Sequence, residues 1–173
     1  MNKKQYLVVD GYNIINAWED LKVISQENLE MARDKLIDIM TEYGAYKGFY
    51  VIVVFDAYLV KGPRKDYEEI RGKNIKVVYT KENQTADTYI EKIISEIGKK
   101  HIIKVATNDW AQQQIVLGSG AFRVSARELK IDVELSQKKI SKKIKETKIQ
   151  KTTLDSILDK NTLSKLEKIR RNH

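Results

Sequence analysis

Four aspartates of this 173-residue chain stand where apolar, strand-like runs end. Asp10 and Asp56 end such runs, Asp109 follows one, and Asp87 lies in the first turn of a helix expected after another. Because the carboxyl ends of parallel strands share one edge of an open sheet, the sequence predicts that these carboxylates gather there. At about 4 Å and an effective dielectric near 20, two like charges repel by roughly 4 kcal/mol, so the cluster requires a cation.

Oxygen-only ligation is typical of Mg²⁺, with Mn²⁺ as the alternative. Such a metal lowers the pKa of a bound water and stabilises charge on phosphorus oxygens. The sequence therefore predicts metal-dependent chemistry on phosphate esters, in which Asp10, Asp87 and Asp109 hold Mg²⁺ and Asp56 completes the shell or orients a ligand. Taken alone, each aspartate also has a structural explanation, and Asp109 in particular would make a good helix N-cap.

Polar neighbours of these aspartates are candidates for supporting roles. Asn13 follows Asp10 in a Gly-Tyr-Asn turn, where it either bonds a carboxylate or phosphate or caps the next segment. Thr107 and Asn108 are expected to hydrogen-bond the carboxylates, and Lys81 to meet a phosphate. His101 starts a predicted strand at the opposite edge, so we expect it to be structural or on the surface.

Other classes of chemistry fit the sequence less well. There is no G-x-S-x-G elbow, no P-loop and no G-x-G-x-x-G after a strand, so no organic cofactor is expected. The absence of cysteine excludes disulfides and thiolate nucleophiles and fits a cytoplasmic protein. No apolar run predicts a membrane span or signal peptide. A phospho-aspartyl enzyme is the fairer rival because Asp10 ends the first strand, although Tyr12 stands where such enzymes usually carry a second acid.

Strand-like runs alternate with helical patterns along the chain, which predicts an α/β fold with a mainly parallel sheet. The predicted strands cover residues 6–10, 50–55, 75–79, 102–107 and 122–124. Between the second and third, residues 57–73 are expected to form a mobile loop beside the site. Lys61 and Arg64 of this loop either contact a phosphate backbone or are simply solvated.

Helices are predicted from caps and apolar spacing. Ser25 is expected to cap a helix that reaches about Tyr46, and a further helix begins near Thr85. Another follows Asp109, and the capping box of Ser125 and Glu128 opens a long basic helix. Two short helical segments are expected after it, at residues 154–158 and 163–169.

The formal charge of +8 lies entirely in the last part of the chain. Residues 137–173 hold twelve Lys/Arg and four Asp/Glu, whereas residues 1–136 hold twenty of each. We therefore predict a domain at 1–136 and a basic helical extension at 137–173. A basic tail indicates nucleic acid, a ribosome or another polyanion as partner, and the alternative is a solvated helix face.

Several segments together resemble the NYN-domain proteins of the YacP type, in the right order over roughly residues 5 to 135. They are DGYNII from Asp10, VFDA from Val54, YTKENQTAD from Tyr79, ATND from Ala106 and GAFRVSAREL from Gly120. The resemblance implies a PIN-like, three-layer nuclease fold with an acidic Mg²⁺ site. It also implies a ribosome-associated endoribonuclease that cuts mRNA in the A site during translation.

Carried over by motif, Asp10, Asp87 and Asp109 are the catalytic metal ligands, and Asp56 belongs to the same cluster. Asn108 departs from the family, which more often has serine there. The basic residues expected to contact RNA or ribosome are Lys61, Arg64, Arg123, Arg127, Lys138, Lys139, Lys142 and Lys143. Two alternatives stay open: a non-catalytic RNA- or ribosome-binding module, and a small-molecule phosphohydrolase.

Overall fold

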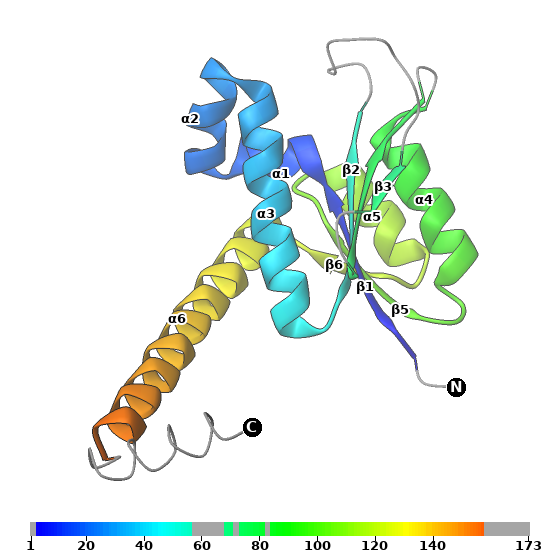
Figure 1. Ribbon diagram of the computed structural model, residues 1–173. Helices are drawn as coiled ribbons and strands as arrows, with labels where there is room; N and C mark the ends of the chain where they lie inside the picture. Colours follow the sequence, from blue (N-terminus) through cyan, green and yellow to red (C-terminus); the bar gives the residue numbers. More distant parts are fainter. Residues whose placement is uncertain (1–2, 57–67, 71–72, 82–83, 158–173) are drawn as a thin grey trace, which may run out of the picture. The chain divides into compact units, whose positions relative to one another are not determined.

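The computed structural model describes residues 3–56, 68–70, 73–81 and 84–157, without the side chains of 68–70 and 148–157. Two compact units make up the chain, Met1–Glu134 and Leu135–His173. In the first unit, strands and helices alternate around a central sheet, which confirms the predicted α/β class (Figure 1). No helix within these ranges is long and apolar enough to cross a membrane.

The central sheet contains six strands among the described residues, in the order β3-β4-β2-β1-β5-β6. They are β1 (Gln5–Asp10), β2 (Tyr50–Phe55), β3 (Glu68–Ile70), β4 (Ile75–Tyr79), β5 (Ile102–Ala106) and β6 (Phe122–Val124). All neighbours pair in parallel except β3, which is antiparallel to β4. In the registers, Asp10 lies beside Val54, and Val9 beside Ala106, so the strands end together at one edge.

The five predicted strands are confirmed to within one residue at their ends. Strand β3 was not predicted, and the loop assigned to residues 57–73 is wrong for Glu68–Ile70. A three-residue strand with two glutamates has no apolar run that a pattern could reveal. Such short, charged strands protect the edges of sheets from further pairing. Lys61 and Arg64 lie outside the described residues.

Helices cover both faces of the sheet, which gives the predicted three layers. The helices α1 (Gly11–Ala17), α2 (Glu19–Glu27) and α3 (Leu29–Lys47) lie on one face, and α4 (Ala86–Ile97) and α5 (Trp110–Gly118) on the other (Figure 1). Successive residues of β1 serve opposite cores: Leu7 and Val9 belong to the cluster with α3, and Val8 to the cluster with α4. This alternation is the period of two that a strand imposes.

The helix predicted to begin at Ser25 begins at Asn28 instead. Asn28 Oδ1 accepts hydrogen bonds from the backbone N–H groups of Glu30 and Met31, at 2.9 and 3.1 Å. Ser25 lies inside α2, where its hydroxyl donates to the carbonyl of Lys22 at 2.7 Å. Asparagine caps helices about as well as serine does, and Ala32, Leu36, Met40 and Tyr43 are among the buried residues of α3.

Two other helix starts follow the prediction. Thr85 caps α4, and its Oγ1 accepts from the backbone N–H of Thr88 at 3.2 Å. In the capping box, Ser125 N–H donates to Glu128 Oε2 at 2.7 Å and Glu128 N–H donates to Ser125 Oγ at 3.2 Å.

The helix α6 that follows the capping box spans Ala126–Ile157 without interruption. The separate helical segment expected at residues 154–158 is therefore wrong, because residues 154–157 belong to α6. Thr152 and Thr153 stand directly before that segment. A threonine disfavours a helix by only a few tenths of a kcal/mol, far less than a proline would, so the helix continues through them. The segment predicted at 163–169 lies outside the described residues.

Candidate active site

The structure brings the four predicted aspartates together at the carboxyl edge of the sheet. Asp10 ends β1 and caps α1, Asp56 follows β2, and Asp109 follows β5 and caps α5. Asp87 is the second residue of α4. Their charges are close enough to act on one another, because Asp87, Asp56 and Asp109 each raise the pKa of Asp10.

Asp10, Asp56, Asp87 and Asp109 form an acidic edge of the sheet. Asp10 is its buried member, with 9% of its surface exposed. The pKa of Asp10 is raised from 3.8 to about 7, mainly by burial and also by the three neighbouring carboxylates, against a hydrogen bond from Asn13 N–H that lowers it. The pKa of Asp87 is also raised, first by burial and then by Asp109 and Asp56. At neutral pH the acidic edge therefore favours a proton or a cation.

The carboxylate of Asp56 is held by Thr80, which follows β4, and by the first residue of α4. Its Oδ1 accepts hydrogen bonds from Thr80 Oγ1 at 3.2 Å and from the backbone N–H of Ala86 at 3.1 Å. The second of these also satisfies a donor at the N-terminus of α4, where a carboxylate is favoured. Asp56 therefore connects the end of β2 to the helix that carries Asp87.

Gln112 of α5 joins the other two aspartates, and sequence reasoning missed it. Its side-chain Nε2 donates to Asp87 Oδ1, and its backbone N–H donates to Asp109 Oδ1 at 3.1 Å. Gln112 is 3% exposed, and its Oε1 has no hydrogen-bond partner among the residues that the structure describes. Gln112 and Gln113 are both buried in α5, so the sequence signal was a pair of polar residues in a short, mostly apolar helix.

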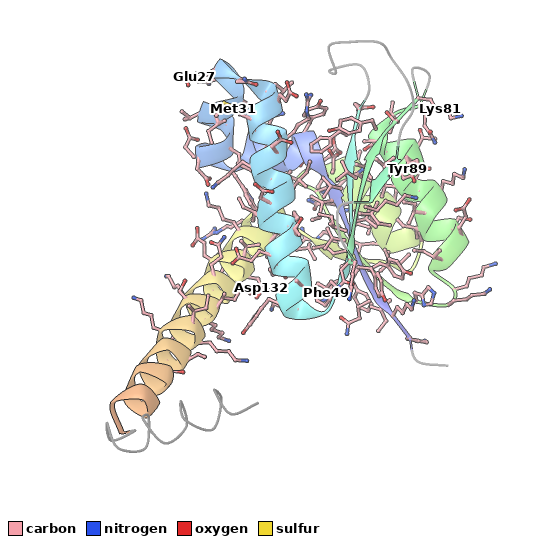
Figure 2. The ribbon with its side chains drawn as sticks, in the orientation of Figure 1. Glu27, Met31, Phe49, Lys81, Tyr89 and Asp132 are labelled. Carbon is pink, nitrogen blue, oxygen red and sulfur yellow. The ribbon has the colours of Figure 1, made fainter. Side chains whose placement is uncertain are left out.

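The predicted supporting residues hold the loop before α5 through its backbone. Asn13 Oδ1 accepts from the backbone N–H of Asn108 at 2.5 Å, and Thr107 Oγ1 accepts from the backbone N–H of Asp109 at 3.1 Å. The expected bonds from Thr107 and Asn108 to carboxylates are thus replaced by bonds that position Asp109. Lys81 is exposed beyond the end of β4 (Figure 2).

Of the described residues predicted to contact RNA, Arg123 is engaged by contacts within the protein, and the others are exposed. Arg123 Nη1 donates to Gln113 Oε1 at 2.9 Å, and its Nη2 lies 3.6 Å from Glu128 Oε2. These contacts give Arg123 a structural role between α5 and the capping box. Arg127 is exposed, as are the four tail lysines, Lys138, Lys139, Lys142 and Lys143.

Two further residues lie at opposite ends of β5, Trp110 beside the aspartates and His101 away from them. Trp110, directly after Asp109, was not singled out in the sequence, yet its side chain is 73% exposed. His101 precedes β5 at the other end of the strand, as predicted, and its ring lies 5.3 Å from that of Tyr6.

The donor set of the acidic edge fits a hard divalent cation. Carboxylate oxygens are the ligands that Mg²⁺ prefers. Each of the four carboxylates, Asp10, Asp56, Asp87 and Asp109, is held through one oxygen, and its other oxygen accepts no hydrogen bond from the described residues. The unpartnered Gln112 Oε1 could accept from a metal-bound water.

In the part of the chain that the structure describes, no three acidic or histidine side chains converge closely enough to form a finished metal site. The carboxylates act on one another as like charges, which favours separated side chains in a cluster without a cation. A divalent cation shared by these carboxylates would need their side chains to move closer together.

A family model for the YacP-like NYN domain matches residues 7–171. This chain belongs to the YacP-like NYN domain family. A relative from Bacillus subtilis (strain 168), described as uncharacterized protein YacP, is 47% identical over 135 residues, which cover 78% of each chain.

Solved structures agree with the assignment to the YacP-like NYN family. The crystal structure of Rae1 (YacP) from Bacillus subtilis matches with a TM-score of 0.74 at 41% identity, covering 99% of this chain and 95% of that one. A substituted variant of Rae1 matches with a TM-score of 0.69 at 40% identity, over 83% and 82% of the two chains. The chain thus carries a nuclease-like domain with a PIN-like fold.

Proposed function

We propose that this YacP-like NYN protein is a cytoplasmic, Mg²⁺-dependent endoribonuclease that binds the ribosome and cleaves mRNA in the A site during translation. The observation that carries the proposal is the meeting of four carboxylates at one edge of a nuclease-like fold, where the other three raise the pKa of Asp10. Residues 1–136 would form the nuclease domain and 137–173 the basic extension.

In this proposal Asp10, Asp87 and Asp109 hold Mg²⁺, and Asp56 completes the set or orients a ligand. The bound metal would supply an activated water and stabilise charge on the phosphorus oxygens. Gln112 fixes the carboxylate of Asp87 through its side-chain amide. The bonds of Asn13 and Thr107 to the loop backbone keep Asp109 in place.

An RNA substrate is supported by the side chains around the edge. Trp110 offers an exposed aromatic face beside Asp109, and unpaired bases stack on such faces. The exposed lysines of α6 supply positive charge for a phosphate backbone. The ribosome as partner rests on the family resemblance and on the charge of the extension.

The deciding experiment is primer extension on one mRNA in Mg²⁺, with and without translating ribosomes. Wild-type protein is compared with Asp87→Asn, and Glu96→Gln at the other end of α4 serves as the matched control. We expect a new 5′ end that requires both the ribosome and Asp87 and that persists with Glu96→Gln. Cuts on naked RNA that require Asp87 would keep the nuclease and remove the ribosome from the proposal.

A second candidate, a non-catalytic RNA- or ribosome-binding module, is favoured by the helix-capping roles of Asp10 and Asp109. It predicts that no message acquires an Asp87-dependent end, although the protein still binds RNA. Hydrolysis of mononucleotides without any cut in RNA would instead identify a small-molecule phosphohydrolase.

A further inference from the structure

Arg33 of α3 is a buried cation that makes no hydrogen bond or ion pair with the four aspartates of the acidic edge. The residue is 9% exposed, and its Nη1 donates to the hydroxyl of Tyr12 at 3.0 Å. This neutral hydroxyl is the only hydrogen-bond partner of Arg33 among the described residues, and no carboxylate there forms an ion pair with it.

A guanidinium group has five N–H donors and a permanent positive charge. Burying it is costly unless the charge is paired and its donors are bonded. Among the side-chain nitrogen and oxygen atoms of the described residues, only His101 Nδ1 and Gln112 Oε1 are both sealed from solvent and without a hydrogen-bond partner. No nitrogen of Arg33 is among them. The unused N–H groups of Arg33 are therefore not fully sealed from solvent, and a ligand can meet them there.

The position of Arg33 links it to the candidate active site. Its partner Tyr12 follows Asp10 by two residues, and the Tyr12 ring packs edge-on against Phe55 at 5.1 Å. Phe55 is the last residue of β2, directly before Asp56, and stacks on Tyr79 at the end of β4. Arg33 thus lies near the same edge of the sheet as the aspartates, in the helical layer opposite α4 and α5.

We propose that Arg33, positioned by Tyr12, binds a backbone phosphate of the RNA beside the phosphate that the acidic edge acts on. The fork of a guanidinium matches two phosphate oxygens, and the phosphate charge compensates the buried cation. A phosphate on this side and the metal-binding carboxylates on the other would fix the strand across the edge. The RNA as ligand rests on the proposed function, whereas the anion site itself does not.

The first test compares the melting temperature of wild-type protein, Arg33→Met and the exposed-site control Lys35→Met, with and without inorganic phosphate. Because Arg33→Met removes the hydrogen bond to Tyr12 and a cation whose pKa the fold raises, we expect it to melt somewhat below wild type without ligand. Phosphate is expected to raise the melting temperature of wild type and of Lys35→Met but not of Arg33→Met. A phosphate response of Arg33→Met equal to that of wild type would make Arg33 structural and overturn the proposal.

The second test measures binding of a short single-stranded RNA in EDTA, so that no cleavage occurs. We expect Arg33→Met to weaken binding about tenfold, the usual effect of losing a charged hydrogen bond. The slope of log K against log salt concentration should be smaller by about 0.7 in Arg33→Met, because each neutralised phosphate contributes about that much. Arg33→Lys should keep the salt dependence and lose part of the affinity, and Tyr12→Phe should weaken binding less than Arg33→Met.

Two outcomes separate this inference from the proposed function. RNA binding that depends on Arg33 in a protein that cuts no RNA would uphold the phosphate position and reject the nuclease. Cleavage that depends on Asp87, with RNA affinity unchanged in Arg33→Met, would uphold the nuclease and reject the phosphate position. A phosphate response through Arg33 without any effect on RNA would leave only a free-anion site and would also reject the inference.

Discussion

Asp10 governs how the acidic edge responds to pH, because it is the most buried of its carboxylates. Its pKa is about 7 in the folded protein against 3.8 without burial, so folding favours the protonated carboxyl. The resulting stabilisation is complete below pH 3.8 and is lost as the pH rises through about 7. A pKa difference of this size corresponds to roughly 4 kcal/mol.

We therefore expect metal-free Asp10→Asn to gain unfolding free energy relative to wild type as the pH rises toward 7 and above. Chemical denaturation in EDTA across this pH range measures the unfolding free energy of both proteins. Taking the difference between them removes the contributions of titrating groups that the two proteins share. Asp38→Asn, at an exposed position of α3, should follow wild type at every pH. A difference that does not change with pH would mean that Asp10 keeps its charge throughout.

Trp110 gives a direct optical signal for RNA at the site. The chain has two tryptophans, and the other, Trp18, is 2% exposed with its Nε1 donating to the carbonyl of Ala126 at 2.8 Å. If a base stacks on Trp110, adding single-stranded RNA in EDTA should quench its emission and leave that of Trp18 unchanged. Trp110→Phe should keep most of the affinity, and Trp110→Ala should lose the roughly 1–3 kcal/mol of one stacked base.

Trp110→Phe is also the optical control, because only buried Trp18 then remains to emit. Quenching by RNA should disappear in that variant. If wild-type emission is unaffected by RNA that demonstrably binds, the exposed tryptophan takes no part in recognition.

At the residue scale, the sequence predicted side chains whose positions follow from strand ends and missed those that depend on distant contacts. The aspartates could be placed because parallel strands end at one edge. Gln112 gains its meaning from Asp87, 25 positions away, and Arg33 from Tyr12, 21 positions away. Neither separation corresponds to a local motif.

At the scale of elements, continuous apolar runs predicted the main strands well, whereas the division of residues 11–47 into three helices was not foreseen. The break between α1 and α2 falls at Trp18, which has no side-chain cap and is held by a bond to Ala126, 108 positions later. A tertiary contact of this kind sets the helix boundary, so the local sequence contains no signal for it. Gly11 likewise is needed because a Cβ there would lie 2.2 Å from the Phe55 ring.

The corrected start of α3 leads to a prediction about stability. Asn28→Ala removes the acceptor for two backbone N–H groups and should lower the unfolding free energy by about 1 kcal/mol. Ser25→Ala should change it by much less, because the Ser25 hydroxyl bonds only a carbonyl already within α2. Urea denaturation of both variants distinguishes the two caps, and a larger loss for Ser25→Ala would restore the original prediction.

At the scale of the whole molecule, the alternation of strands and helices predicted the fold class, and the motif order predicted the PIN-like family. The order of strands within the sheet did not follow from periodicity, because it depends on which edges pair after crossover. The segregation of charge was visible in the sequence alone: all of the net +8 lies in residues 137–173. That segregation predicts how the whole protein should respond to salt.

The basic extension should supply much of the affinity for RNA or ribosome. Replacing Lys138, Lys139, Lys142 and Lys143 with glutamine removes four exposed charges from α6. Each lysine that neutralises a phosphate contributes about 0.7 to the slope of log K against log salt, so the slope should fall by up to roughly 3. Binding of a single-stranded RNA in EDTA and co-sedimentation with ribosomes, both at increasing salt, measure the effect.

The matched control removes the same number of charges from exposed positions in the first unit, at Lys22, Lys35, Lys99 and Lys100. Both quadruple variants lower the net charge by four, so a general loss of attraction would affect them equally. Only direct phosphate contacts by α6 would flatten the salt dependence of the first variant alone. Equal slopes in the two variants would make these α6 lysines a solvated helix face and would leave recognition to the residues around the acidic edge.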